Sequence, residues 1–541
     1  MVRLLNVYSI SAFVSLGGVL YGFDIASISD IIGTAHYRNF YGNPLGIHQG
    51  VITAAIAGGS FVGALCSSVL GDWLSRKVAI QLGTILWCIG SSLQAASTGV
   101  PMLIIGRIFS GLCVGLTSSL VPIYLAEIAP RKIRGRTVAF QHFATGLGTV
   151  IQYFIQYGCS FLHTNAVFRL PWAIQIVPAI VLFIGLFWLP PSPRWLASKD
   201  RWDMVLQVLA SLRTPNCDIN HPLVLAEYKE IEEQIKLERE NAMNSYRELF
   251  STKMRRRLFL GMATQALSQL SGVIQLLYYI VYVLRAANYH PLNPNPTRTL
   301  IAAAIMYIVF TVGTIPSIIW TDQWGRRSSL LVGALSVAFW MYLIGVIMAR
   351  FGEPNPVPNQ PSTWVIIAHP AASGAVQASC YLAAAAFAMS WGPIEWLYPA
   401  EIFPLRIRAT AVSLSTAINW ATNFVLALAM PSLLRSIQWR VYIIFGSFNI
   451  GAFIYVFFWV PETKQRTLEE MDEVFEHGEP VWRSFTGVPR TNRLDVLAHE
   501  FEIGIRSIHR IIYVEMHNDV ERNGVRGRQS TVGPRRSVTS M

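Results

Sequence analysis

Apolar residues dominate twelve stretches of about 20 residues in this chain, and short polar segments, many of them basic, separate the stretches. About 20 apolar residues in a helix are enough to cross the hydrocarbon core of a bilayer, which is about 30 Å thick. The pattern therefore predicts an all-α integral membrane protein with twelve transmembrane helices. The predicted spans are 8–30, 50–71, 79–97, 101–124, 137–158, 171–189, 258–284, 299–321, 329–349, 370–397, 410–431 and 437–459.

A polar segment divides the twelve spans into two groups of six. We expect an N-terminal six-helix bundle over 1–189, a cytoplasmic central loop over 190–257, a C-terminal six-helix bundle over 258–460, and a partly disordered cytoplasmic tail over 461–541. Within the central loop, "HPLVLAEYKEIEEQIKLERE" carries apolar residues at roughly helical spacing among charges. The loop is therefore predicted to form short amphipathic helices.

Composition agrees with a membrane protein, because 52% of the residues are hydrophobic and only 14% are charged. Lys and Arg cluster in the segments after spans 2, 4, 8 and 10 and in the central loop. By the positive-inside rule, these segments and both termini are predicted to be cytoplasmic. The net charge of +12 then faces an anionic membrane leaflet, and no nucleic-acid partner is expected. The first span is interpreted as a signal anchor.

Two short motifs occur twice, at equivalent places in the two halves. "GDWLSRK" after span 2 returns as "TDQWGRR" after span 8, and "AEIAPRKIRGR" after span 4 returns as "AEIFPLRIRAT" after span 10. Two motifs repeated in register indicate parallel six-helix halves, related by an axis along the membrane normal. A binding site between the halves near the membrane midplane is expected for such a repeat.

Each repeated motif places an acidic residue beside a basic cluster on the same side of the membrane. We interpret these residues as cytoplasmic gating pairs that latch one conformation. The alternative is that they are solvated loop charges, worth about 0–1 kcal/mol each. The expected pairs are Asp72 with Arg76, Glu127 with Arg134, Asp322 with Arg326, and Glu401 with Arg408.

Two charges of the first half lie deep within apolar spans. Asp24 belongs to "GGVLYGFD" in span 1, and Arg107 belongs to "IIGRIFSG" in span 4. A charge at the bilayer centre costs at least about 2.5–3.5 kcal/mol, so such a residue usually faces a partner or a transport pathway. A conformational change that makes and breaks this pair would load and release a proton. A static ion pair that only packs the helices is the alternative.

Six motifs in order carry a family resemblance over residues 8–475: "GGVLYGFD", "GRIFSGLCVG", "PSPRWL", "SQLSGVIQLLYY", "SWGPIEW" and "PETKQRTLEE". On these motifs the chain resembles the sugar porter family of the major facilitator superfamily, and most of all its fungal hexose transporters of the high-affinity glucose type. The resemblance implies a monomeric plasma-membrane protein with the major facilitator fold. It also implies import of a monosaccharide, glucose or xylose, by alternating access with proton symport, and it assigns the proton-coupling role to Asp24 and Arg107.

Other functions remain open at this point. A facilitative sugar uniporter would bind the same sugars without coupling to protons, and a non-transporting sugar sensor would bind them without net flux. An enzyme or an ATP-driven pump is not expected, because the sequence has no phosphate-binding loop, no cluster with metal-ligand spacing and no nucleophile–base pair. No cofactor is predicted, and the proton is the expected coupling ion.

Sugar binding requires neutral hydrogen-bonding groups and an aromatic face in an otherwise apolar cleft. The resemblance places Gln269, Trp396, Asn419, Trp420 and Asn423 at sugar-contact positions. Bonds between helices, or packing, are the alternatives for each of these side chains. The full set of candidates in the spans is Gln141, His142, Gln269, Gln275, Trp396, Asn419, Trp420 and Asn423.

The chain departs from the family pattern at several positions, including His142 and Thr149 of span 5, where Gln is frequent. Ile274 replaces an Asn in span 7 and Phe310 stands at a polar position of span 8, which predicts altered recognition of sugar hydroxyls. Ser75 replaces a Gly and Pro191 replaces a Glu, which predicts a looser cytoplasmic latch. Pro393, beside Trp396, is expected to break span 10 and form an extracellular gate.

Overall fold

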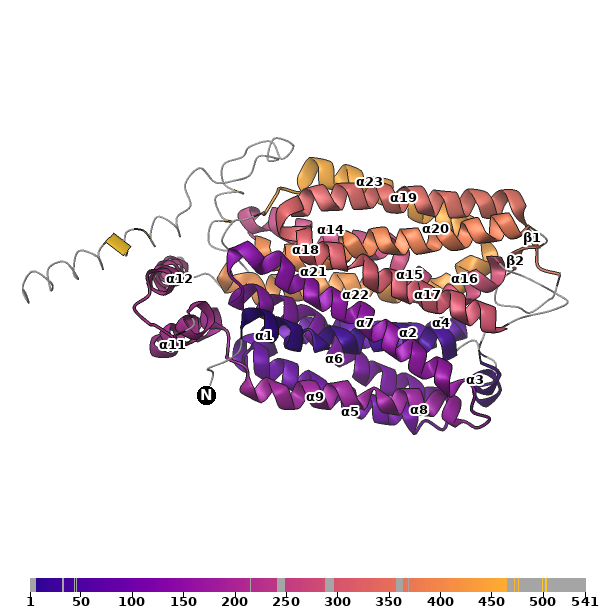
Figure 1. The fold of residues 1–541 in the computed structure, drawn as a ribbon, viewed down its shortest axis with the longest axis horizontal. Coiled ribbons are helices and arrows are strands. Elements are labelled where there is room, and N and C mark those ends of the chain that lie inside the picture. The colour runs from indigo at the N-terminus through magenta and orange to yellow at the C-terminus, as the bar shows by residue number, and fades with distance from the viewer. Residues whose placement is uncertain are drawn as a thin grey trace, which may run out of the picture.

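A computed structural model gives the fold and describes residues 6–31, 34–42, 44, 46–214, 216–240, 249–287, 296–356, 363–367 and 369–464, with isolated positions beyond. Its helices run along one long axis, and the N-terminal half lies beside the C-terminal half (Figure 1). Most of the predicted tail over 461–541 lies outside the described residues.

Each of the first six predicted spans is a helix or a broken helix. Span 1 consists of α1 and α2, and span 6 consists of α8, α9 and a short 3-10 turn, η2. A short helix, α3, follows span 1, and the 3-10 turn η1 precedes α7. The bounds are α1 Val7–Val14, α2 Leu16–Ile31, α3 Ala35–Phe40, α4 Ile47–Trp73, α5 Arg76–Ala95, α6 Val100–Ile128, η1 Arg131–Ile133, α7 Arg134–Cys159, α8 Ala166–Ile174, α9 Ile176–Gly185 and η2 Leu186–Trp188.

The other six spans form the second half in the same way. Three of them are broken: span 7 into α14, α15 and α16, span 8 into α17 and α18, and span 10 into α20 and α21. An antiparallel pair of short strands, β1 and β2, joins spans 9 and 10. The bounds are α14 Thr252–Leu270, α15 Val273–Tyr278, α16 Ile280–Ala287, α17 Pro296–Gly313, α18 Ile315–Trp324, α19 Arg326–Phe351, β1 Gly352–Pro354, β2 Trp364–Ile366, α20 Pro370–Met389, α21 Trp391–Ile402, α22 Leu405–Ser436 and α23 Arg440–Trp459.

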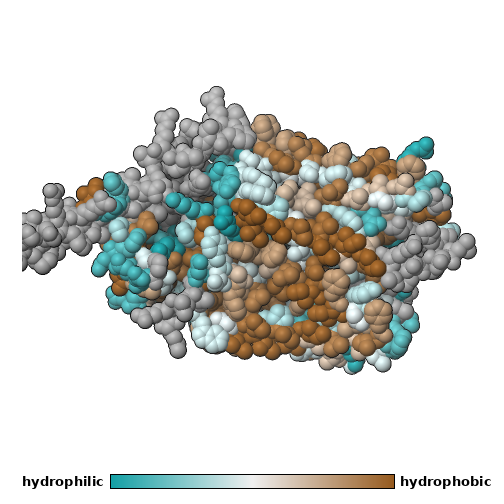
Figure 2. All heavy atoms as spheres, in the orientation of Figure 1, coloured by the Kyte–Doolittle hydropathy of each residue, from teal (hydrophilic) through white to brown (hydrophobic). Residues whose placement is uncertain are grey.

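The chain is a multi-pass membrane protein. Among the described residues, ten helices are long and apolar enough to cross a membrane, and the bent pair of span 7 makes eleven. Within the described residues, the one predicted span that does not meet this test is span 5, α7, which is less apolar because it carries Gln141, His142, Gln152 and Gln156, all buried inside the protein. On the face seen in Figure 2, brown apolar residues cover the middle of the molecule and teal polar residues lie toward the two ends.

The central loop forms a small helical unit, as the sequence predicted. Its helices are α10 Pro193–Ser198, α11 Trp202–Arg213 and α12 Pro222–Glu240, which pack around a separate apolar core that includes Leu196, Leu209 and Ile231. Arg213 ties this unit to the membrane domain, because it binds Glu227 of α12 at 2.7 and 2.8 Å and donates to the Ile128 carbonyl at 2.9 Å. α11 and α12 lie at one end of the bundles, here called the α12 end, opposite α3 and the strands (Figure 1).

Small residues allow the helices of the first half to approach closely. Gly59 and Gly63 of α4 lie against the backbone of α6, and Gly111 and Gly115 of α6 lie against the backbone of α4. A Cβ atom at any of these four positions would overlap a carbonyl oxygen of the facing helix. The "GGSFVGA" and "SGLCVG" stretches therefore bring α4 and α6 into close contact, as small residues commonly do in membranes.

The breaks in spans 7 and 10 have different causes. Gly272 adopts a left-handed conformation, with φ +81°, between α14 and α15, and the span bends by 70° before α16. Span 10 breaks at Ser390, and Pro393 lies in the first turn of α21. Pro393 has no N–H to bind the carbonyl of Met389, the last residue of α20, so the span breaks where this proline was predicted to break it.

Candidate functional site

The buried charges of the first half meet each other. Nη2 of Arg107 on α6 lies 3.0 Å from Oδ1 of Asp24 on α2, and the two side chains are 0% and 2% exposed. Among the described residues, Oδ2 of Asp24 and both Nε and Nη1 of Arg107 have no hydrogen-bond partner. The pair is thus held by one contact between the two helices, although an arginine and a carboxylate can make two.

The second bundle packs against the helix that carries Asp24. α15 of the second bundle contacts α2. Tyr21 of α2 packs edge-on against Trp420 of α22, with ring centroids 5.1 Å apart. Asp24 therefore lies on the side of the first bundle that faces the second.

Three of the predicted sugar-contact residues form one cluster in the second bundle. Nε2 of Gln269 donates to Oδ1 of Asn419 at 3.1 Å, and Nδ2 of Asn423 donates to Oε1 of Gln269 at 2.8 Å. All three side chains are fully buried. A chain of neutral amides in an apolar surrounding is the kind of surface that binds sugar hydroxyls.

The sequence analysis missed three further members of this cluster. Gln265 accepts from Nδ2 of Asn419 at 2.6 Å, and Ser268 donates to the carboxyl of Glu395 on α21. Glu395 also accepts from Nδ2 of Asn419 at 3.3 Å. The signal was available, because Glu395 is a charge within an apolar span, as Asp24 is, and Gln265 and Ser268 lie within one helical turn of Gln269.

The remaining candidates of the second bundle have different surroundings. Trp420 is buried and donates from Nε1 to the Ser118 hydroxyl of α6 at 3.0 Å, so it connects the two bundles. Trp396 is buried on α21. Gln275 is fully buried, and neither its amide nitrogen nor its oxygen has a hydrogen-bond partner among the described residues. Buried polar atoms normally have partners, so Gln275 is available to a ligand.

Gln141 and His142 of α7 present polar atoms from the first bundle. Both are buried, and Oε1 of Gln141 and Nε2 of His142 have no hydrogen-bond partner among the described residues. The His142 ring packs against Phe310 of α17, with centroids 5.3 Å apart, and close to Gly392 of α21. The departure at Phe310 is therefore an aromatic contact across the two bundles, while Ile274 is a buried apolar residue of α15.

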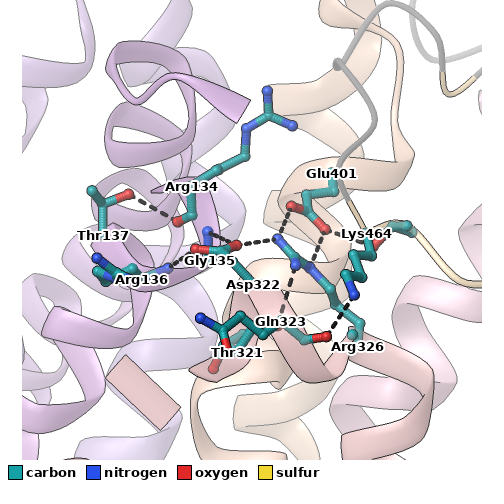
Figure 3. Close-up of polar contacts among 12 residues, drawn as sticks. Arg134, Gly135, Arg136, Thr137, Thr321, Asp322, Gln323, Arg326, Glu401 and Lys464 are labelled. Carbon is teal, nitrogen blue, oxygen red and sulfur yellow. Dashed lines mark hydrogen bonds and ion pairs between the residues drawn. The ribbon is translucent and has the colours of Figure 1, made fainter. Parts of the chain in front are cut away.

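The gating residues form two equivalent clusters at the α12 end. In the first half, Arg76 binds Asp72 at 2.9 Å and Glu127 at 3.4 Å. In the second half, Arg326 binds Asp322 at 3.2 Å and Glu401 at 2.8 Å (Figure 3). Each cluster joins an arginine at a helix start to an acid four residues earlier and to the glutamate of the "AEI" motif.

Two of the four expected pairings were wrong. Glu127 pairs with Arg76 instead of Arg134, and Glu401 pairs with Arg326 instead of Arg408. The reason is helix packing: α5, which begins at Arg76, lies along α6, whose last turn carries Glu127, and α19 contacts α21 in the same way. Arg408 instead donates to the Phe403 carbonyl at 3.1 Å.

One member of the second cluster also reaches the other bundle. Oδ1 and Oδ2 of Asp322 accept from the backbone N–H groups of Gly135 and Arg136, each at 2.9 Å, at the start of α7 (Figure 3). A carboxylate at the start of a helix binds free N–H groups and is favoured by the helix dipole. Asp322 therefore connects the two bundles directly, through two hydrogen bonds at the α12 end.

Ser75 and Gly325 occupy equivalent turns, and both have a positive φ, +99° and +87°. With ψ near 155°, the Ser75 backbone lies in a region that only glycine adopts without strain of about 1–3 kcal/mol. We expect Ser75→Gly to stabilise the protein by about 1 kcal/mol, after the loss of the weak Ser75–Val78 cap at 3.3 Å. The midpoint of thermal unfolding in detergent measures this change. The control Gly325→Ser should lower the midpoint, and a lower midpoint for Ser75→Gly would contradict the prediction.

This chain is similar to known proteins over most of its length. Residues 10–475 match the family model described as "Sugar (and other) transporter". The chain is 46% identical over 521 residues to "MFS glucose transporter mfs1" of Aspergillus flavus, a match that covers 94% of this chain and 97% of the relative. It is 38% identical to "High-affinity glucose transporter" of Kluyveromyces lactis, with 90% and 88% covered.

A solved structure shows the same fold. The "MFS (major facilitator superfamily) proton:xylose symporter XylE bound to 6-bromo-6-deoxy-D-glucose" superposes with a TM-score of 0.74 at 24% identity, over 87% of this chain and 99% of that one. This match confirms the major facilitator fold predicted from the sequence. With the family match and the two glucose transporter relatives, it leads to one conclusion: this chain belongs to the sugar transporter family.

Proposed function

We propose that this protein imports a hexose, with glucose as the first substrate to test, across the plasma membrane by alternating access coupled to a proton. Relatives at 46% and 38% identity are named glucose transporters, and they cover nearly the whole chain. The amide cluster of Gln269, Asn419 and Asn423 supplies donors and acceptors for sugar hydroxyls, and Trp396 and Trp420 supply aromatic faces nearby.

The contact between Asp24 and Arg107 is the observation that supports proton coupling. Both groups are buried, and an ion pair removed from water is costly unless its remaining donors and acceptors are satisfied. Here three of those atoms have no hydrogen-bond partner among the described residues. Separation of α2 from α6 would leave Asp24 without its cation, and protonation is then the least costly way to keep the carboxyl buried.

Alternating access requires the bundles to separate at one end at a time. They now touch at both ends of the antiparallel helices α4 and α22. Ser413 donates to the Ala64 carbonyl at 2.6 Å, and Gly50 lies against the backbone of Leu428. At the α12 end, the hydrogen bonds from Gly135 and Arg136 to Asp322 hold the bundles together in addition to the Ser413–Ala64 contact. We assign the α12 end, where the basic clusters lie, to the cytoplasm, so opening toward the cytoplasm must break the Asp322 bonds.

Uptake of radiolabelled glucose into vesicles containing the purified protein tests this proposal. We expect rapid glucose entry that unlabelled glucose and xylose inhibit, at a rate at least about tenfold above that of protein-free vesicles. An inward proton gradient should drive accumulation above the external concentration. Entry that stops at equilibrium with a proton gradient present would identify a uniporter. Sugar binding without any flux would identify a sensor, and either result would contradict the proposal.

A further inference from the structure

Glu395 is a buried carboxyl of the second bundle. It lies on α21, every residue of which is buried, and its side chain is 2% exposed. None of the ion pairs within the described residues includes Glu395. A buried carboxyl without a cation must be stabilised by hydrogen-bond donors, whether they come from the protein or from a ligand.

Two neutral donors on the neighbouring helices α14 and α22 bind this carboxyl. The Ser268 hydroxyl and Nδ2 of Asn419 both bind the same oxygen, Oε2. Nε2 of Gln265 donates at 2.9 Å to the backbone carbonyl of Glu395 and so fixes this part of α21 against α14. Two carboxyl oxygens offer about four acceptor positions, so capacity remains for further donors.

The same bonds connect Glu395 to the residues proposed to bind sugar. Asn419, which donates to Glu395, also accepts from Gln269, and Gln269 accepts from Asn423. Glu395 is therefore one hydrogen bond from Asn419 and two from Gln269. It precedes Trp396 on α21, as Ser268 precedes Gln269 on α14.

Glu395 also lies near the boundary between the bundles. The Tyr21 ring of α2 packs against Trp420 of α22, whose centroid is 5.1 Å away. Trp420 follows Asn419, which donates to Glu395. One turn before Glu395, Gly392 lies against the His142 ring of α7. The carboxyl thus lies where a ligand enclosed between the two bundles would meet α21.

We propose that Glu395 is a sugar-binding residue that accepts a hydrogen bond from one hydroxyl of the hexose, with Ser268 and Asn419 as positioning residues. The assignment rests on the proposed function. An acceptor that two neutral donors hold in place selects for a hydroxyl at one position of the ring. Glu395 then supplies an acceptor in a cluster where Ile274 and Phe310 supply none.

Binding of glucose and of its five monodeoxy analogues to purified protein, measured by calorimetry, tests the assignment. In the wild type, one deoxyglucose should bind at least about tenfold more weakly than glucose because of the missing hydroxyl. In Glu395→Ala, the Kd of that deoxyglucose divided by the Kd of glucose should fall to about two or less. The same ratio for each of the other four analogues should stay as it is in the wild type. Glu395→Gln has a single acceptor oxygen, which Ser268 and Asn419 would bind, and its NH2 group cannot accept, so this variant should also reduce the ratio.

Variants of α14 provide the controls. Ser268→Ala should reduce the same ratio, whereas Thr264→Val, a buried hydroxyl of the same helix that donates to the Leu260 carbonyl, should leave it unchanged. Equal weakening of all six sugars in Glu395→Ala would overturn the assignment. If that variant does not fold, an unchanged ratio in Glu395→Gln overturns it equally. Absence of hexose binding by the wild type would instead refute the proposed function, and this assignment with it.

Discussion

Arg107→Met is expected to abolish proton-driven sugar accumulation and to destabilise the protein by about 3–5 kcal/mol. The substitution leaves Asp24 buried without its 3.0 Å partner, and removal of one member of a buried pair is strongly destabilising. Among the described residues, Arg107 is the one cation that pairs with Asp24. A lower midpoint of thermal unfolding in detergent, with loss of accumulation in vesicles, is the expected result.

The double variant Asp24→Asn with Arg107→Met separates the two effects. With both charges removed, no unpaired charge remains, so most of the stability should return. Accumulation should not return, because no titratable group remains at the pair. A double variant as unstable as Arg107→Met alone would show that the arginine stabilises the helices by packing, and that its charge matters little.

Asp322→Asn is expected to shift the protein toward states open at the α12 end by about 10- to 100-fold. The substitution removes the charge and one of two acceptors that bind Gly135 and Arg136 across the bundles. A hydrogen bond to a charged group contributes about 1.5–3 kcal/mol, which corresponds to a population shift of this size. Alkylation of a cysteine placed at Ser413, which is now buried against Ala64, reports the opening.

The equivalent substitution in the first half is the matched control. The Asp72 side chain is 48% exposed and pairs with Arg76 of its own half. Asp72→Asn should therefore change the alkylation rate of the Ser413→Cys protein less than about twofold. Cys66 is also exposed and will react with the alkylating reagent. The alkylation rate measured without the Ser413→Cys substitution is therefore subtracted. Equal acceleration by Asp72→Asn and Asp322→Asn would contradict a specific role for the bond between the bundles.

The fold was predictable from the sequence because a membrane imposes a length and a composition on each span. All twelve predicted spans are helices or broken helices, and α12 of the central loop lies where the apolar spacing predicted a helix. The contact between Asp24 and Arg107 was predictable for a related reason. Each is a charge deep within an apolar span of the first half, so each needs a partner inside the protein.

The partners of the gating glutamates were not predictable in the same way. Glu127 and Arg76 are 51 residues apart and Glu401 and Arg326 are 75 apart, so the pairing depends on which helices pack together. The sequence repeat placed all these residues at one end of the bundles but did not choose among the arginines there. Glu395 was missed although the cost of burying its charge is the same as for Asp24, since its span was considered only for Pro393 and Trp396.

Accumulation of glucose in vesicles under an inward proton gradient, compared between the wild type and Asp24→Asn, tests the central claim most directly. Glucose that equilibrates without a gradient in both proteins provides the control for folding and sugar binding. The account predicts that the wild type concentrates glucose above the external level and that Asp24→Asn only equilibrates it. Equilibration alone in the wild type, or undiminished accumulation in Asp24→Asn, would contradict a proton carried by Asp24.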